Sequence, residues 1–183
     1  VIHRNVLDTT PVTPDRVMTL HDAVDTDLFS LRQVDRNSAR REFGFTDDLI
    51  VIGLVGRFSP GKGHEELLEA ATLLSKKYSN IHFLIVGEAS HGEERYAQRI
   101  RTLSLSLGLE KVVAFSGYRN DIPEVMAALD IFAFPSHAES FGVVLIEAMA
   151  MERPVVSTNC DGVLDIVVDG QTGVYVHPRN ATE

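Results

Sequence analysis

The chain has 183 residues, 44% of them hydrophobic and 23% charged, and carries a formal net charge of −9 at pH 7. This surplus of acid argues against non-specific nucleic-acid binding, which depends on clustered Lys and Arg side chains meeting phosphates. No apolar run approaches 18 residues and no signal-like start is present, so we expect a soluble globular chain rather than a membrane-spanning one. The single cysteine, Cys160, cannot form an internal disulfide, which fits a reducing compartment.

The first 48 residues show no regular alternation of elements. Residues 1–15 lack clear periodicity and include a proline-containing run typical of a loop. Residues 16–20 predict a short strand, and residues 38–43 predict a short helix ended by Gly44. We therefore interpret residues 1–30 as a linker and edge segment, and residues 31–183 as one Rossmann-like domain.

From residue 49 onward, short β-rich runs alternate with helical patterns, as in βαβ units. The predicted strands, apolar throughout, are residues 49–55, 81–86, 112–115, 131–134, 154–157 and 173–176. The predicted helices are residues 63–78, 93–107, 122–129 and 142–151. Strands that are apolar along their whole length are typical of a sheet covered on both faces. The pattern predicts an α/β fold, a Rossmann-like three-layer sandwich around a mostly parallel six-stranded sheet.

The loop after the first regular strand is rich in glycine and carries two cations, Arg57 and Lys62. It is not a P-loop, because Gly63 stands where Ser or Thr would follow the lysine, and the third glycine of a dinucleotide motif is missing in register. An arginine fork and a lysine point charge beside accessible backbone such as Gly56 suit a diphosphate. The alternative for this loop alone is a surface turn with solvated charges.

A second stretch, residues 134–150, predicts a buried strand, a polar loop carrying Glu139 and a helix that opens near Gly142. The start of a helix presents unpaired backbone N–H groups and the positive end of its dipole, so we expect the backbone of residues 140–143 to bind a phosphate. Glu147, one turn inside the helix, is placed to accept hydrogen bonds from ribose hydroxyls. Helix starts favour acids for dipole reasons, which explains Glu139 better than Glu147.

These two stretches are expected to meet. With the strand order 3-2-1-4-5-6, strands 1 and 4 are neighbours where the order reverses, and ligands bind at their carboxyl ends. A glycosidase pair of carboxylates is an alternative for Glu139 and Glu147, but such pairs need no adjacent diphosphate cradle. The loop at 117–121, with Tyr118 and Arg119, could contact a base or be a plain turn. The seven histidines show no zinc-ligand spacing, so we expect no metal site.

Several of these segments together resemble the donor-binding domain of family 4 retaining glycosyltransferases, which have GT-B architecture. The resemblance runs from about residue 16 to residue 178. The segments that carry it are Arg57 with Lys62-Gly63, Glu139-Ser140-Phe141-Gly142 with Glu147-Ala148-Met149-Ala150, Pro154-Val155-Val156, Asp169-Gly170-Gln171-Thr172-Gly173, and the linker-like stretch His21 to Phe29. The spacing of the two glutamates combined with that of the arginine and lysine is specific.

The resemblance implies a site for a UDP- or GDP-linked sugar that needs no metal. It implies catalytic roles for Glu139, Arg57 and Lys62. The implied donor-binding residues are Gly56, Arg57, Lys62, Tyr118, Arg119, Glu139, Ser140, Phe141, Gly142, Val143 and Glu147. It also implies a partner, the N-terminal acceptor-binding domain of the same protein, and no nucleic-acid or membrane contact from this part. We expect a cytoplasmic location, with peripheral membrane association of the full-length protein left open.

Departures from the family pattern leave the site residues untouched. Glu152 stands where a glycine usually ends the helix before Pro154, and Ala23 stands where the linker usually has glycine. Asp165 stands where the family usually has glutamate, so the negative charge is kept on a shorter side chain. The chain lacks an initial Met and ends in a pattern typical of a helix start, so we expect it to be a fragment of a longer protein. Because the resemblance implies that the acceptor side belongs to an N-terminal domain, we expect the fragment to bind nucleotide sugar weakly and to transfer nothing by itself. The alternatives are a GT-B nucleotide-sugar epimerase, a glycosidase, and a non-catalytic nucleotide-binding module.

Overall fold

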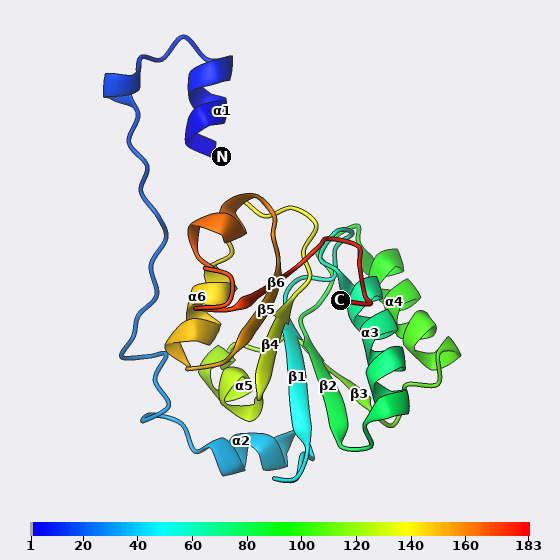
Figure 1. Ribbon diagram of the computed structural model, residues 1–183. Helices are drawn as coiled ribbons and strands as arrows, with labels where there is room; N and C mark the ends of the chain where they lie inside the picture. Colours follow the sequence, from blue (N-terminus) through cyan, green and yellow to red (C-terminus); the bar gives the residue numbers. More distant parts are fainter. Residues whose placement is uncertain (1) are drawn as a thin grey trace.

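A computed structural model describes residues 2–183 and shows a three-layer α/β body with an N-terminal extension that runs away from it (Figure 1). The elements in chain order are α1 (Ile2–Thr9), η1 (Pro14–Arg16), α2 (Arg36–Glu42), β1 (Ile50–Val55), α3 (His64–Lys77), β2 (Ile81–Val86), α4 (Glu94–Ser106), β3 (Val113–Gly117), α5 (Ile122–Ala128), β4 (Ile131–Phe134), α6 (Val143–Ala150), β5 (Val155–Thr158), η2 (Asp161–Asp165) and β6 (Val174–Val176).

The six strands form one sheet in the order β3-β2-β1-β4-β5-β6, and every neighbouring pair is parallel. The predicted fold class and strand order are therefore confirmed. The order reverses between β1 and β4, which pair through Ile52 with Ile131 and Gly53 with Phe132. All six carboxyl ends thus lie along one edge of the sheet, where the connecting loops can meet.

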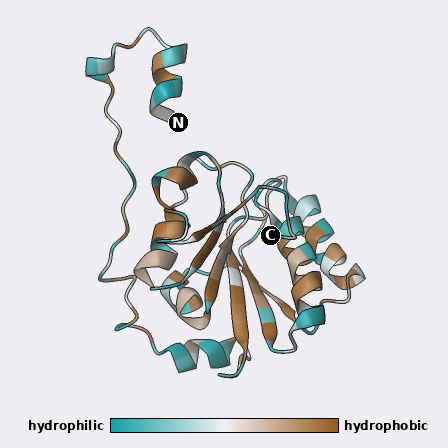
Figure 2. Cartoon of the chain, in the orientation of Figure 1, coloured by the Kyte–Doolittle hydropathy of each residue, from teal (hydrophilic) through white to brown (hydrophobic). Residues whose placement is uncertain are grey.

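Two hydrophobic cores cover the two faces of the sheet, because successive strand side chains point to opposite faces. On one face Ile52 and Leu54 of β1 pack with α3 and α4, and on the other Val51 packs with α5 and α6. Figure 2 shows the matching pattern, with hydrophobic colour along the strands and hydrophilic colour on the outer helix α2. The strands are largely apolar because helices cover both faces of the sheet.

Helix α2 is bound to the amino-terminal ends of the strands by hydrogen bonds from Arg36 and Arg40. Asp35 caps it by accepting a hydrogen bond from the backbone N–H of Asn37 at 3.0 Å, as N-cap aspartates do. Arg40 is 2% exposed and donates to Asp130 Oδ2 at 3.0 Å. Asp130 in turn accepts from the backbone N–H of Val51 at 2.8 Å and from Arg36 at 2.6 Å. This network ties α2 to the start of β4 and to β1.

The N-terminal region differs from the prediction in two ways. Helix α1 occupies residues that were expected to be irregular, and the strand predicted at residues 16–20 was wrong. The 3-10 turn η1 ends at Arg16, and the chain then runs on without regular structure to residue 25. Met18 and Leu20 are 84% and 86% exposed, so the apolar residues that suggested a strand meet no neighbouring strand. Within residues 2–183, no helix is long and apolar enough to cross a membrane.

Candidate functional site

The loop after β1 is held against the end of β2 by close backbone packing. The N–H of Gly56 donates to the carbonyl of Val86 at 3.0 Å. Gly87 has φ +136°, and a Cβ there would lie 1.9 Å from the carbonyl oxygen of Gly56. Only glycine allows this approach, because any side chain would collide with backbone that cannot move aside. The start of the cationic loop is therefore fixed before Arg57 is reached.

The end of the same loop is fastened to the loop that follows β4. Gly63, the N-cap of α3, has φ +77°, and a Cβ at this position would lie 2.2 Å from the carbonyl oxygen of Pro135. The N–H of His137 donates to the carbonyl of Gly61 at 2.8 Å. The two loops are thus joined backbone to backbone, and the predicted meeting of strands 1 and 4 brings their loops together.

Helix α6 begins inside this junction. Gly142 is its N-cap in the left-handed region, with φ +101°, and offers no side chain to cap the first turn. From behind, Gly162 of η2 donates its N–H to the carbonyl of Glu139 at 2.9 Å, and a Cβ on Gly162 would lie 2.1 Å from the carbonyl oxygen of Ser140. The backbone that precedes α6 is therefore held in place, with first-turn N–H groups that suit an anion.

A pocket of about 370 Å³ lies at this junction. Nine of the eleven predicted donor-binding residues line it: Gly56, Arg57, Lys62, Glu139, Ser140, Phe141, Gly142, Val143 and Glu147. Its cations come from the loop after β1, and its helix N-terminus comes from the loop after β4. The pocket also contains Asp22, Ser136 and Val144, which the sequence analysis did not assign to a donor site.

Lys62 and Glu139, which both line the pocket, form an ion pair. Lys62 Nζ donates to Glu139 Oε2 at 2.5 Å, and the two side chains are 24% and 16% exposed. Arg57 is held more loosely, since its guanidinium donates to Ser90 Oγ at 3.3 Å. Removing one partner of a partly buried ion pair is destabilising, because the other charge is left without its counter-ion. Lys62 therefore has a fixed position from which it can share its remaining donors with a ligand.

Glu147 lies one turn inside α6, and burial raises the pKa of its carboxyl group. A half-buried carboxylate gains from any hydrogen-bond donor that replaces the water it has lost. Hydroxyl groups of a ligand in the pocket would be such donors. The position and the raised pKa of Glu147 therefore suit contact with a polyol, such as ribose.

Tyr118 and Arg119 lie in an adjoining pocket of about 480 Å³, which shares Val55, Gly56 and Arg57 with the first. Tyr118 is 70% exposed and open to a flat partner. The guanidinium of Arg119 is already bound to Asp121 and to Glu42 at 2.6 Å, and it lies 5.2 Å from the ring centroid of Phe43. Arg119 therefore lines this pocket mainly as a brace between α2 and the loop after β3.

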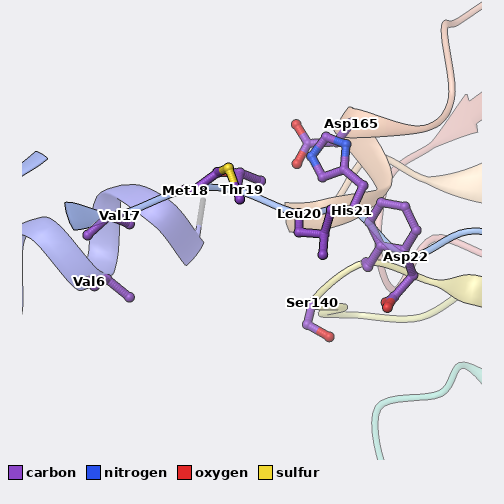
Figure 3. A pocket seen from close by; sticks show the side chains of 10 residues that line it. Val6, Val17, Met18, Thr19, Leu20, His21, Asp22, Ser140 and Asp165 are labelled. Carbon is purple, nitrogen blue, oxygen red and sulfur yellow. The ribbon is translucent and has the colours of Figure 1, made fainter. Parts of the chain in front are cut away.

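A third pocket, of about 630 Å³, lies between the N-terminal segment and the loop before α6 (Figure 3). It shares Asp22, Ser140 and Phe141 with the first pocket and adds His21 and Asp165. The ring of His21 stacks on Phe141, with 5.5 Å between centroids and 27° between planes. From the sequence, residues 16–20 were expected to form a strand within a linker, and no residue of this segment was expected to line a site. The one signal was the resemblance of residues 21–29 to a linker motif.

Other reactive side chains near the site are engaged in structural contacts. His137 Nε2 lies 2.7 Å from Glu66 Oε1, which fixes the loop two residues before Glu139. Burial raises the pKa of the Cys160 thiol, which disfavours the reactive thiolate. Among the side chains of residues 4–183, no group of three or more His, Cys, Asp or Glu is arranged to hold a metal ion.

Comparison with known proteins agrees with this geometry. A family model described as "Glycosyl transferases group 1" matches residues 35–183. A D-inositol 3-phosphate glycosyltransferase of Corynebacterium aurimucosum is 33% identical over 187 residues, covering 98% of this chain and 44% of the relative. The capsular polysaccharide biosynthesis glycosyltransferase CapM of Staphylococcus aureus is 34% identical over 153 residues, covering 81% of this chain and 38% of the relative. The chain therefore spans less than half the length of these relatives.

Solved structures give the same result. HepE of Anabaena in complex with UDP and glucose superimposes with a TM-score of 0.82 at 33% identity, covering 89% of this chain and 44% of that one. The C-terminal domain of a glycosyl transferase group 1 protein, LpcC of Francisella tularensis, superimposes with a TM-score of 0.76 at 31% identity, covering 87% and 82%. The chain belongs to the glycosyl transferases group 1 family, with a fold like the C-terminal half of GT-B glycosyltransferases.

Proposed function

We propose that this chain is the donor-binding domain of a retaining glycosyltransferase that uses a UDP- or GDP-linked sugar. The observation that carries the proposal is the 370 Å³ pocket, where two cations, a helix N-terminus and two carboxylates converge. HepE, the relative crystallised with UDP and glucose, supports a nucleotide-sugar donor.

The charges of the pocket residues indicate which part of such a donor each would bind. Arg57, Lys62 and the first-turn N–H groups of α6 would bind the diphosphate and stabilise the negative charge that develops as it departs. Glu147 would accept hydrogen bonds from the ribose. Glu139 would hold Lys62 and face the transferred sugar, and the adjoining pocket with Tyr118 would receive the base.

Calorimetric titration of the chain with UDP, GDP and ADP, followed by the matching nucleotide sugars, tests the proposal. We expect binding of at least one nucleotide diphosphate, without added metal and unchanged by a chelator. Lys62→Ala should weaken that binding roughly ten- to a hundredfold, because a charge-assisted contact contributes about 1.5–3 kcal/mol.

Lys111→Ala is the matched control, since Lys111 is exposed and precedes β3 at the opposite edge of the sheet. It removes the same charge and should leave affinity unchanged. If no nucleotide bound the wild-type chain, or if both variants weakened binding equally, the proposed diphosphate site would be wrong.

We further propose that the chain by itself binds donor and transfers nothing, because the acceptor would be held by an N-terminal domain of the full-length protein. The extent of the match, 44% of the C. aurimucosum relative, supports this division. Measurable glycosyl transfer by the chain, with any acceptor, would contradict it. The anomeric configuration of a product made by the full-length enzyme would test retention, and the expected cytoplasmic location stays a prediction.

A further inference from the structure

The segment at residues 17–22 reaches the donor pocket although it lies outside the sheet. Asp22 lines the 370 Å³ pocket together with Arg57, Lys62 and Glu139. Every other residue that lines this pocket lies between Leu54 and Glu147, in β1, β4, α6 or the loops beside them. Asp22, which lies 28 positions before the first residue of β1, thus contributes a carboxylate to the site.

Two contacts hold the segment in this place. His21 stacks on Phe141, the residue directly before the N-cap of α6. Downstream, Asp25 Oδ1 accepts from the N–H groups of Asp27 and Leu28 at 2.9 and 3.2 Å, and Phe29 is buried at 9% exposure. Upstream, Met18 and Leu20 are almost fully exposed. Val24 is partly buried and packs against the hydrophobic core of the body. The stack of His21 on Phe141 and the packing of Val24 therefore attach the segment on the two sides of Asp22.

The chemistry of Asp22 indicates which part of a donor it would face. A carboxylate repels phosphate, and the cations that attract phosphate lie in the loop after β1. Sugar hydroxyls donate hydrogen bonds, and an ionised carboxylate only accepts them. Asp22, at the boundary between the donor pocket and the 630 Å³ pocket (Figure 3), is placed for the hydroxyls of the transferred sugar.

We propose that Asp22 is a specificity-determining residue that binds the sugar hydroxyls of the donor, and that His21 is a positioning residue that holds Asp22 at the pocket by stacking on Phe141. This inference rests on the proposed function, because it requires a nucleotide sugar in the pocket. It adds that the linker segment forms one wall of the donor site.

The test is the ratio of two dissociation constants, that of the free nucleotide diphosphate divided by that of its sugar conjugate. The probes are UDP with UDP-glucose and UDP-N-acetylglucosamine, and GDP with GDP-mannose, taking the conjugate that wild type binds most tightly. Asp22→Ala should lower the ratio about tenfold, since it removes a charged hydrogen-bond acceptor for the sugar. Affinity for the free diphosphate should stay equal or rise. Asp27→Ala, in the same segment but outside both pockets, is the matched control and should leave the ratio unchanged.

Two variants separate positioning from chemistry at residue 21. His21→Ala should lower the same ratio by roughly two- to tenfold, and His21→Phe should restore it, because a stacked ring pair contributes about 0.5–1.5 kcal/mol whichever ring supplies it. A ratio near one in wild type, or equal ratios for wild type and Asp22→Ala, would overturn the inference while leaving the proposed function intact. Failure of wild type to bind any of the nucleotides would overturn both.

Discussion

At the scale of single residues, His64 is notable for being fully buried beside the cationic loop. It is 0% exposed, its ring stacks on Phe58 at 4.4 Å and meets Tyr96 edge-on at 5.9 Å. Phe58 follows Arg57, and His64 follows Lys62 by two residues, so the stack closes the base of the loop between the two cations. Neither ring nitrogen has a hydrogen-bond partner within the described residues, which makes a charged ring costly at this position.

Burial lowers the pKa of His64 from its ordinary value of 6.5 to about 4, while Glu65 acts in the opposite direction. Between these values the unfolded chain binds a proton that the folded chain does not. Stability is therefore lost as the pH falls from about 6.5 to 4. His64→Phe keeps a stacked ring and removes the titration. We expect the unfolding free energy of the variant minus that of wild type to increase by about 2–3 kcal/mol when the pH is lowered from 7 to 4.5.

Chemical denaturation of both proteins at several pH values measures this difference directly. Other titrating groups are common to the two proteins and cancel in the comparison. A difference that stayed constant across the pH range would show that His64 takes up its proton in the folded state at an ordinary pKa.

At the scale of elements, α6 ends in a motif that normally takes glycine. The N–H of Arg153 donates to the carbonyl of Ala148 and that of Glu152 to the carbonyl of Met149, both at 2.9 Å. These two bonds define a Schellman motif with Glu152 at its left-handed position, where φ is +57°. Glu152 thus occupies the position where the family usually has glycine, and its positive φ is the conformation that glycine adopts most easily.

Glu152→Gly should therefore stabilise the domain by about 0.5–1 kcal/mol. Glycine removes the strain of a non-glycine residue at positive φ, and this gain exceeds the added conformational entropy of the unfolded chain. Glu69→Gly, at an exposed position inside α3, should destabilise it by about 1 kcal/mol. The denaturation midpoints of the two variants, compared with that of wild type, show whether each substitution raises or lowers stability. A loss of stability in both would mean that the Glu152 side chain makes a contact worth more than the strain.

At the scale of the whole molecule, the body and its N-terminal extension are expected to contribute unequally to stability. The extension is mostly exposed up to residue 28, and Phe29 is the first described residue whose apolar side chain is buried. The body contains both hydrophobic cores and the network that binds α2 to the sheet. Folding of the donor pocket should therefore need little of the extension.

Removal of residues 1–16 should change the unfolding free energy by less than about 0.5 kcal/mol, because few buried contacts are lost. Removal of residues 1–30 should lower it by about 2 kcal/mol or more, since the buried ring of Phe29 is lost. Urea denaturation of the two truncated chains measures both effects. Equal destabilisation by the two truncations would show that α1 packs on the body more firmly than its exposure indicates.

Much of the site could be predicted because parallel strands end at a common edge. Arg57 and Lys62 follow β1, and Glu139 follows β4, so the order of the strands alone brings them together. Glu147 follows from the helical period. In contrast, Asp22 reaches the donor pocket, and His21 the pocket beside it, through a segment without periodicity. The apolar residues before them suggested a strand that does not form.

The sequence by itself determined the sheet, the positions of its helices and the convergence of two charged loops, because these depend on local periodicity and on a small set of allowed connections. Only the tertiary structure decided how the loops fit together. Gly87, Gly63 and Gly162 each admit backbone from a distant part of the chain at distances that a Cβ would forbid. The linker likewise became a wall of the pocket through the His21–Phe141 ring contact and the packing of Val24 on the core. Contacts of this kind join residues far apart in the chain and leave no pattern in the local sequence.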